Sequence, residues 1–142
     1  MLHHAKKDRY HDSVVKALIK AGWKITHDPY FLRLGRRKGF IDLGAEKVII
    51  GAEKGVEKIA VEIKSFLGDS DVDQFEDAIG QFLVYRPALS KKDPKRVLFL
   101  AMPVDFYERL FEDEYFKELA DLYDLKIIVF NSNDNSIVSW KK

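Results

Sequence analysis

The segment from residue 96 to residue 102 reads Arg-Val-Leu-Phe-Leu-Ala-Met and is apolar at nearly every position. A strand with water on one face alternates apolar and polar residues, whereas an almost continuous apolar run is typical of a strand covered on both faces. Helical patterns flank this run over residues 70–85 and 105–123. A buried strand between two helices predicts a mixed sheet flanked by helices, which is an α/β fold.

The rest of the chain adds one helix and further strands to this centre. The first helix is expected over residues 8–21, because Gly22 stands where a helix commonly ends. Pro87 is expected just beyond the end of the second helix. Strands are expected over residues 23–26, 40–44, 48–50, 58–66, 126–130 and 137–140. With no repeat or linker in 142 residues, we expect a single domain spanning residues 1–142.

Composition excludes several classes of protein. The chain contains no cysteine, which rules out disulfides and thiolate metal sites. No stretch approaches the roughly 18 consecutive apolar residues of a membrane helix. The charged N-terminus has no apolar run behind it, unlike a secretory signal. We therefore expect a cytoplasmic protein that has no membrane partner.

The net charge of +1 argues against a protein that binds nucleic acid through bulk charge alone. The basic residues are unevenly distributed, however, and two clusters stand out. One lies between residues 91 and 96. The other provides our candidates for contact with DNA, which are Arg33, Arg36, Arg37 and Lys38.

Two polar side chains share one face of the expected strand over residues 58–66. Because side chains alternate along a strand, Glu62 and Lys64 project from the same face, between otherwise apolar positions. An exposed strand often alternates Glu and Lys in this way, so a solvated face is the simpler interpretation. The alternative is a pair of catalytic groups.

Asp42 favours the catalytic interpretation. Aspartate is disfavoured inside strands, yet this one stands between two apolar residues, Ile41 and Leu43. If its strand pairs near the strand of Glu62, two carboxylates converge. Such oxygen ligands suit Mg²⁺ or Mn²⁺, with water completing the coordination. We therefore expect Asp42 and Glu62 to bind the metal and Lys64 to hold the attacking water or stabilise charge on a phosphate.

Other polar residues are candidates for supporting roles. Gln81 and Tyr85 are four residues apart and so lie on one helix face, where they are expected to position the substrate. An ordinary solvated helix face is the alternative. His11 and Asp12, early in the first helix, are possible accessory residues that reach the metal or its water. The four histidines show no zinc-site spacing, and there is no phosphate-binding glycine loop.

Taken together, Asp42, Glu62-Ile63-Lys64 and Gln81-Phe82-Leu83-Val84-Tyr85 resemble the D…ExK…QxxxY series of PD-(D/E)xK nucleases. The QxxxY part is similar to the RecB-type branch. This resemblance implies a restriction-endonuclease-like αβββαβ core. The sequence departs from the pattern at Ile41, where nucleases often have proline, and in the first helix, where relatives often have glutamate.

The chain also resembles, over nearly its whole length, the XisH family of fdxN-element excision controlling factors of cyanobacteria. The matching stretches are residues 17–23, 26–29, 41–47, 58–68 and 80–86. The resemblance implies a part in the programmed excision of a DNA element during heterocyst differentiation. In that system a separate recombinase exchanges the strands, and a small partner protein, XisI, acts alongside.

Three hypotheses follow. The first is a magnesium-dependent DNA endonuclease or nickase. The second is a non-catalytic subunit that binds DNA or directs recombination together with an XisI-type partner. The third is an interaction subunit whose aromatic helix contacts XisI or a second copy of the chain, which would make a homodimer. For the aromatic side chains a role in the core is an equal alternative; they are Phe106, Tyr107, Phe111, Tyr115 and Phe116.

Overall fold

The computed structural model describes residues 10–51, 55–66 and 70–142. The strands of this part of the chain are β1 (Lys24–His27), β2 (Tyr30–Leu34), β3 (Arg37–Ile41), β4 (Leu43–Ile49), β5 (Gly55–Ile63), β6 (Arg96–Pro103), β7 (Ile127–Asn131) and β8 (Ser136–Lys141). The helices are α1 (His11–Lys20), α2 (Asp71–Lys92), α3 (Val104–Phe111) and α4 (Glu114–Leu122). None of these helices is long and apolar enough to cross a membrane.

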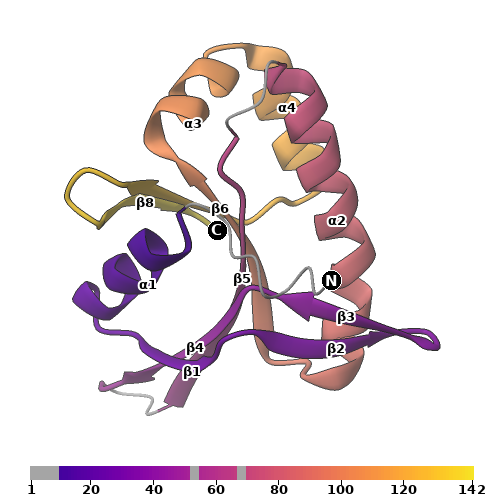
Figure 1. The fold of residues 1–142 in the computed structure, drawn as a ribbon, viewed down its shortest axis with the longest axis vertical. Helices are drawn as coiled ribbons and strands as arrows, with labels where there is room; N and C mark the ends of the chain where they lie inside the picture. The colour runs from indigo at the N-terminus through magenta and orange to yellow at the C-terminus, as the bar shows by residue number, and fades with distance from the viewer. Residues whose placement is uncertain (1–9, 52–54, 67–69) are drawn as a thin grey trace.

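Six strands form one mixed sheet in the order β1-β4-β5-β6-β7-β8, and β2 and β3 form a separate hairpin (Figure 1). The pairs β5–β6 and β6–β7 are parallel, whereas β1–β4, β4–β5 and β7–β8 are antiparallel. Helices lie on both faces of this sheet. The predicted α/β class, a mixed sheet flanked by helices, is therefore confirmed.

The central strand β6 is covered on both faces, as its apolar run predicts. Leu98 and Leu100 belong to the core beneath α2, α3 and α4, while Phe99 and Ala101 belong to the core beneath α1. Residues 96 and 98–103 are buried, and Val97 is the exposed exception. The alternation expected for β5 is also present, because Ala60 faces the α2 side and Ile59, Val61 and Ile63 face the α1 side.

The second helix is longer than predicted. It continues through Pro87 to Lys92 instead of ending at Tyr85. A proline inside a helix removes one hydrogen bond and disfavours the turn before it. Here that loss is outweighed by packing, since Leu89 is fully buried in the core. The prediction that Pro87 ends the helix was wrong for this reason.

The expected helix over residues 105–123 is two helices. Helix α3 ends at Phe111, and the Asp113 side chain caps α4 by accepting a hydrogen bond from the Tyr115 N–H at 3.0 Å. Such capping starts a new helix and favours a break over a continuous one. Of the five aromatic side chains in this region, four pack in or against the core and Tyr115 is 59% exposed.

The hairpin of β2 and β3 was not predicted as a whole. Its turn contains Gly35 with φ +63, a conformation that glycine adopts without strain. On its inner face Tyr30 and Leu32 are buried in the core together with residues of α2. The expected strand over residues 40–44 is divided at Asp42, where the chain leaves the hairpin and enters the main sheet as β4. Residue 42 therefore joins the two sheets.

Candidate active site

Asp42 and Glu62 lie together, as the sequence predicts. Strands β4 and β5 are antiparallel with Leu43 opposite Val61, which places the residue before β4 beside the end of β5. The Asp42 N–H donates to Glu62 Oε1 at 3.3 Å, and the Ile63 N–H donates to Asp42 Oδ2 at 2.7 Å. Each carboxylate is thus fixed by the backbone beside the other.

Glu62 does not lie on a solvated strand face. Its side chain is on the side of β5 that packs toward α2, and the residue is 6% exposed. Burial raises the pKa of the Glu62 carboxyl well above its usual range, and the nearby Asp42 carboxylate raises it further. Lys64 and the Asp42 N–H act in the opposite direction. A carboxylate in this position favours a proton or a cation close to it.

The chemistry of this pair fits a hard divalent cation. Two carboxylates converge in a region of low dielectric, and Mg²⁺ is commonly bound by one or two carboxylates with water as the other ligands. Among the described residues no group of three or more His, Asp or Glu side chains is placed to hold a metal. Asp42 and Glu62 would therefore be the protein ligands, and the remaining positions would be open to water and substrate.

Lys64 follows directly after β5. Its backbone N–H donates to the Ala101 carbonyl at 3.2 Å, which continues the pairing of β5 with β6 for one more residue. The side chain is half-buried and follows Glu62 by two positions in the extended chain, so both project to the same side, and the Lys64 charge lowers the pKa of Glu62. The three residues expected at the site are thus neighbours.

Gln81 and Tyr85 occupy α2, the helix that packs on the same side of the sheet as Glu62. Both are half-buried, and Tyr85 packs against the core. Neither side chain forms a hydrogen bond with Asp42, Glu62 or Lys64 in the described structure. Their expected role toward a substrate stays a prediction.

His11 and Asp12 differ sharply in their surroundings. Asp12 is exposed. His11 is 3% exposed, and its Nε2 lies 2.9 Å from Asp28 Oδ1, which is an ion-pair distance if the ring is protonated. That approach lacks the geometry of a hydrogen bond, and neither ring nitrogen has a hydrogen-bond partner among the described residues. Asp28 was not among the site residues expected from the sequence, because its contact with His11 joins residues that are distant along the chain.

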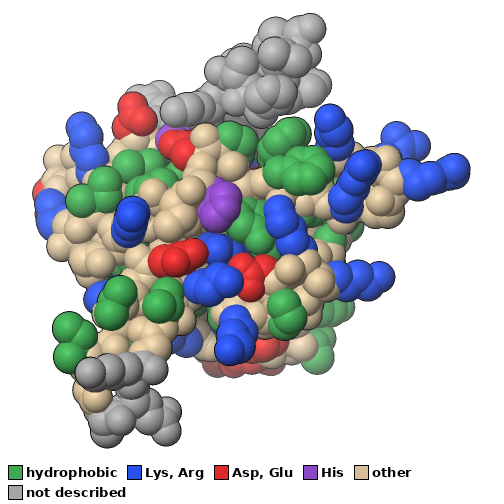
Figure 2. Space-filling model, turned by 90° about the horizontal axis from the view of Figure 1, so that it is seen from below, with side chains coloured by type: hydrophobic (Ala, Val, Ile, Leu, Met, Phe, Trp, Pro, Cys, Tyr) green, Lys and Arg blue, Asp and Glu red, His purple; other side chains and the backbone are tan. Residues whose placement is uncertain are grey.

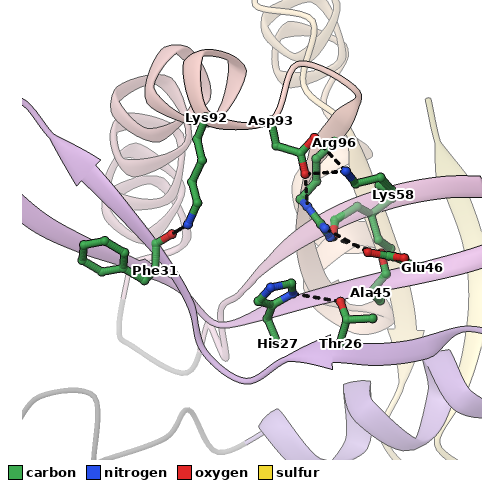
Figure 3. Close-up of polar contacts among 10 residues, drawn as sticks. Thr26, His27, Phe31, Ala45, Glu46, Lys58, Lys92, Asp93 and Arg96 are labelled. Carbon is green, nitrogen blue, oxygen red and sulfur yellow. Dashed lines mark hydrogen bonds and ion pairs between the residues drawn. The ribbon is translucent and has the colours of Figure 1, made fainter.

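The two basic clusters have different roles. Arg33, Arg36, Arg37 and Lys38 are all exposed on the β2–β3 hairpin, and Figure 2 shows Lys and Arg side chains crowded where this hairpin projects at the right. Arg96, by contrast, is buried and is held by Asp93 and by Glu46 (Figure 3). The cluster between residues 91 and 96 is therefore partly a structural network rather than a basic surface.

Comparison with known proteins identifies the family. The model of the family described as XisH protein matches residues 4–138. The chain belongs to the XisH family. A crystal structure of an XisH family protein from Nostoc punctiforme PCC 73102 is 36% identical, with a TM-score of 0.84 over 95% of this chain and 100% of that one.

A second crystal structure is similar to the same extent. An fdxN element excision controlling factor protein from Anabaena variabilis is 36% identical, with a TM-score of 0.83 over 94% of this chain and 98% of that one. No curated protein matches the chain. The identity and the coverage together confirm the resemblance inferred from the sequence.

Proposed function

We propose that this XisH-family protein is a magnesium-dependent DNA endonuclease or nickase built on a single PD-(D/E)xK-like domain. The observation that carries the proposal is the pair formed by the buried Glu62 and the half-buried Asp42, each held by a backbone N–H, with Lys64 beside them. Two carboxylates this close, one of them largely removed from water, repel each other unless a proton or a cation lies near them, so the pair is destabilising without such a ligand.

The residues would divide the work as follows. Asp42 and Glu62 would hold Mg²⁺ or Mn²⁺, and such an ion would supply Lewis-acid activation of the phosphate and of water. The Lys64 ammonium orients the attacking water and stabilises the charge that develops on the phosphate oxygens. Gln81 and Tyr85 contact the sugar or phosphate of the bound strand. The phosphodiester bond is broken by water, with one hydroxyl and one phosphate end as products.

The biological setting of the proposal comes from the family. One relative of known structure is described as an fdxN element excision controlling factor. We propose the same setting for this chain, namely programmed excision of a DNA element in heterocyst differentiation, with an XisI-type partner and in the cytoplasm. Tyr115, exposed on α4, is a candidate residue for the partner or for a second copy of the chain.

Purified protein incubated with supercoiled plasmid and with branched DNA tests the enzymatic proposal. We expect nicking that requires Mg²⁺ or Mn²⁺, stops with EDTA, and falls by at least about 10²-fold in Asp42→Asn and in Lys64→Ala. Glu118→Gln is a matched control, because it removes an exposed carboxylate on α4 that has no assigned part in the site. Nicking that is equal in wild type and Asp42→Asn, or absent with every metal and substrate, refutes the proposal.

One observation favours a second candidate function, a non-catalytic DNA-binding or recombination-directing subunit. The β2–β3 hairpin carries four exposed basic residues that could contact DNA without any part in cleavage, namely Arg33, Arg36, Arg37 and Lys38. This candidate predicts that the double variant Asp42→Asn, Glu62→Gln still binds DNA and an XisI-type partner and still supports excision in cells. Loss of excision with unchanged binding would favour the nuclease.

A further inference from the structure

A groove separates the turn of the β2–β3 hairpin from the C-terminal half of α2, and the hairpin crosses that helix (Figure 1). Its volume is about 290 Å³, close to the lower limit of about 300 Å³ for sites that bind small ligands. Its apolar floor consists of Leu34, Val84, Pro87 and Ala88. Its basic rim consists of Arg33 and Lys91. The groove is separate from the pair of carboxylates.

The surroundings of the groove are strongly basic. Arg36, Arg37 and Lys38 lie in the same hairpin next to the groove, and all three are exposed, as are Arg33 and Lys91. None of the five is within ion-pair distance of a carboxylate of the described residues. Arg33 and Lys38 are opposite each other across the hairpin, where like charges are destabilising unless an anion lies between them. In a chain of net charge +1, this concentration of charge is complementary to a polyanion.

The apolar floor of the groove suits a nucleobase, whereas the basic rim suits phosphate. Val84 is 59% exposed there despite its apolar side chain. Pro87 also lines the groove and adds the apolar surface of its ring beside Val84. An unpaired base offers an apolar face, which a duplex keeps within its base stack. The floor therefore matches a base, and the rim matches its phosphates.

We propose that this groove binds an unpaired nucleotide of a DNA strand, with the base on Val84 and Pro87 and the phosphates between Arg33 and Lys91. The inference deepens the proposed nuclease function, on which its biological meaning rests, by naming the form of DNA. Strand β3 runs from Arg37 beside the groove to the residue before Asp42. Five residue steps of about 3.3 Å put about 17 Å of protein strand between the groove and Asp42. The preferred substrate is thus a DNA strand that is unpaired near the cut.

Binding without metal tests the groove independently of cleavage. Fluorescence anisotropy in EDTA compares a labelled thymidine oligonucleotide of about 16 nucleotides, the upper site size of single-strand binding folds, with its duplex. Val84→Glu places a negative charge on the floor, and Val138→Glu is the matched control, since Val138 is 51% exposed on β8 at the far edge of the sheet. We expect Val84→Glu to weaken single-strand binding at least about tenfold relative to the control.

Salt dependence checks the rim. Each lost phosphate contact reduces the slope of log affinity against log salt by about 0.7 for a single strand, so we expect this reduction in Arg33→Ala and in Lys91→Ala. Equal affinities of Val84→Glu and Val138→Glu overturn the proposal, and so does an equal loss of duplex binding in Val84→Glu. If Val84→Glu binds the single strand as Val138→Glu does while Asp42-dependent nicking persists, the groove proposal is refuted and the nuclease proposal is kept. If nicking is absent but Val84→Glu abolishes single-strand binding, the nuclease proposal is refuted and the groove proposal is kept.

Discussion

Replacing Arg96 with methionine removes a buried cation from the network that joins β4, β5 and the end of α2. The side chain is 3% exposed. Its guanidinium donates to Asp93 Oδ2 at 3.0 Å and to the Ile59 carbonyl at 2.9 Å, with longer contacts to the Ala45 carbonyl at 3.4 Å and to Glu46 Oε2 at 3.2 Å. Methionine fills a similar volume and offers no donor.

The size of the stability loss depends on which contacts the partners of Arg96 retain after the substitution. Glu46 is 35% exposed, so its contact contributes little. Asp93 retains Lys58, whose Nζ lies 2.8 Å away. Burial alone would raise the pKa of Asp93, but the hydrogen bonds from Lys58 and Arg96 outweigh it and lower that pKa. Arg96→Met therefore leaves two buried carbonyls without their donor and removes one of the two cations that contact Asp93. We expect the free energy of unfolding to fall by about 3 kcal/mol, the lower end of the range for breaking a buried ion pair.

For a chain of this length we convert that loss to a fall in Tm of about 10 °C. Urea titration and thermal melting followed by circular dichroism measure it. Arg96→Lys keeps the charge but not the forked donor geometry, so we expect about half the loss. Lys95→Met is the control, since Lys95 is exposed, and should change stability by less than about 0.5 kcal/mol. If Arg96→Met is as stable as Lys95→Met, apolar packing compensates for the network and the reasoning is wrong.

Two further predictions concern Glu62 and the helix break. Because the folded pKa of Glu62 is raised, the folded state holds a proton that the unfolded state has released. In EDTA the wild type therefore loses stability as pH rises from about 4.5 through that raised pKa, and Glu62→Gln removes this slope. Melting at several pH values checks it, and an unchanged slope would contradict the burial argument. Asp113→Ala removes the cap of α4 and should cost about 1 kcal/mol, or about 3 °C in Tm; Glu112→Ala, an exposed neighbour outside the cap, is the control.

The sequence predicted the neighbourhood of Asp42 and Glu62 because strand alternation and local polarity are short-range signals. An aspartate between apolar residues, and a glutamate facing the same way as a lysine two positions on, are visible without the fold. Their proximity follows because residues 43–49 form one strand, β4, which pairs with β5, whereas the sequence suggested a separate strand over residues 48–50 between them.

Other features depend on contacts between distant residues and left no local signal. The continuation of α2 past Pro87 depends on the burial of Leu89. The contact of His11 with Asp28 joins a helix to a turn 17 residues later. The β2–β3 hairpin alternates in burial but not in residue type, because Phe31 and Phe40 are apolar on its outer face, where their rings contact each other.

The position of Asp42 links the carboxylate pair mechanically to the basic turn of the β2–β3 hairpin. Glu62 is fixed within the central sheet, whereas Asp42 is attached to the last residue of β3, whose other end carries the basic turn. Any shift of that hairpin moves the N–H that Asp42 donates to Glu62. DNA held at the turn and a cation held by the carboxylates would then alter each other's affinity by the same factor, since thermodynamic coupling is reciprocal. Cation affinity measured with and without DNA would show whether strand β3 transmits such a shift from the turn to Asp42.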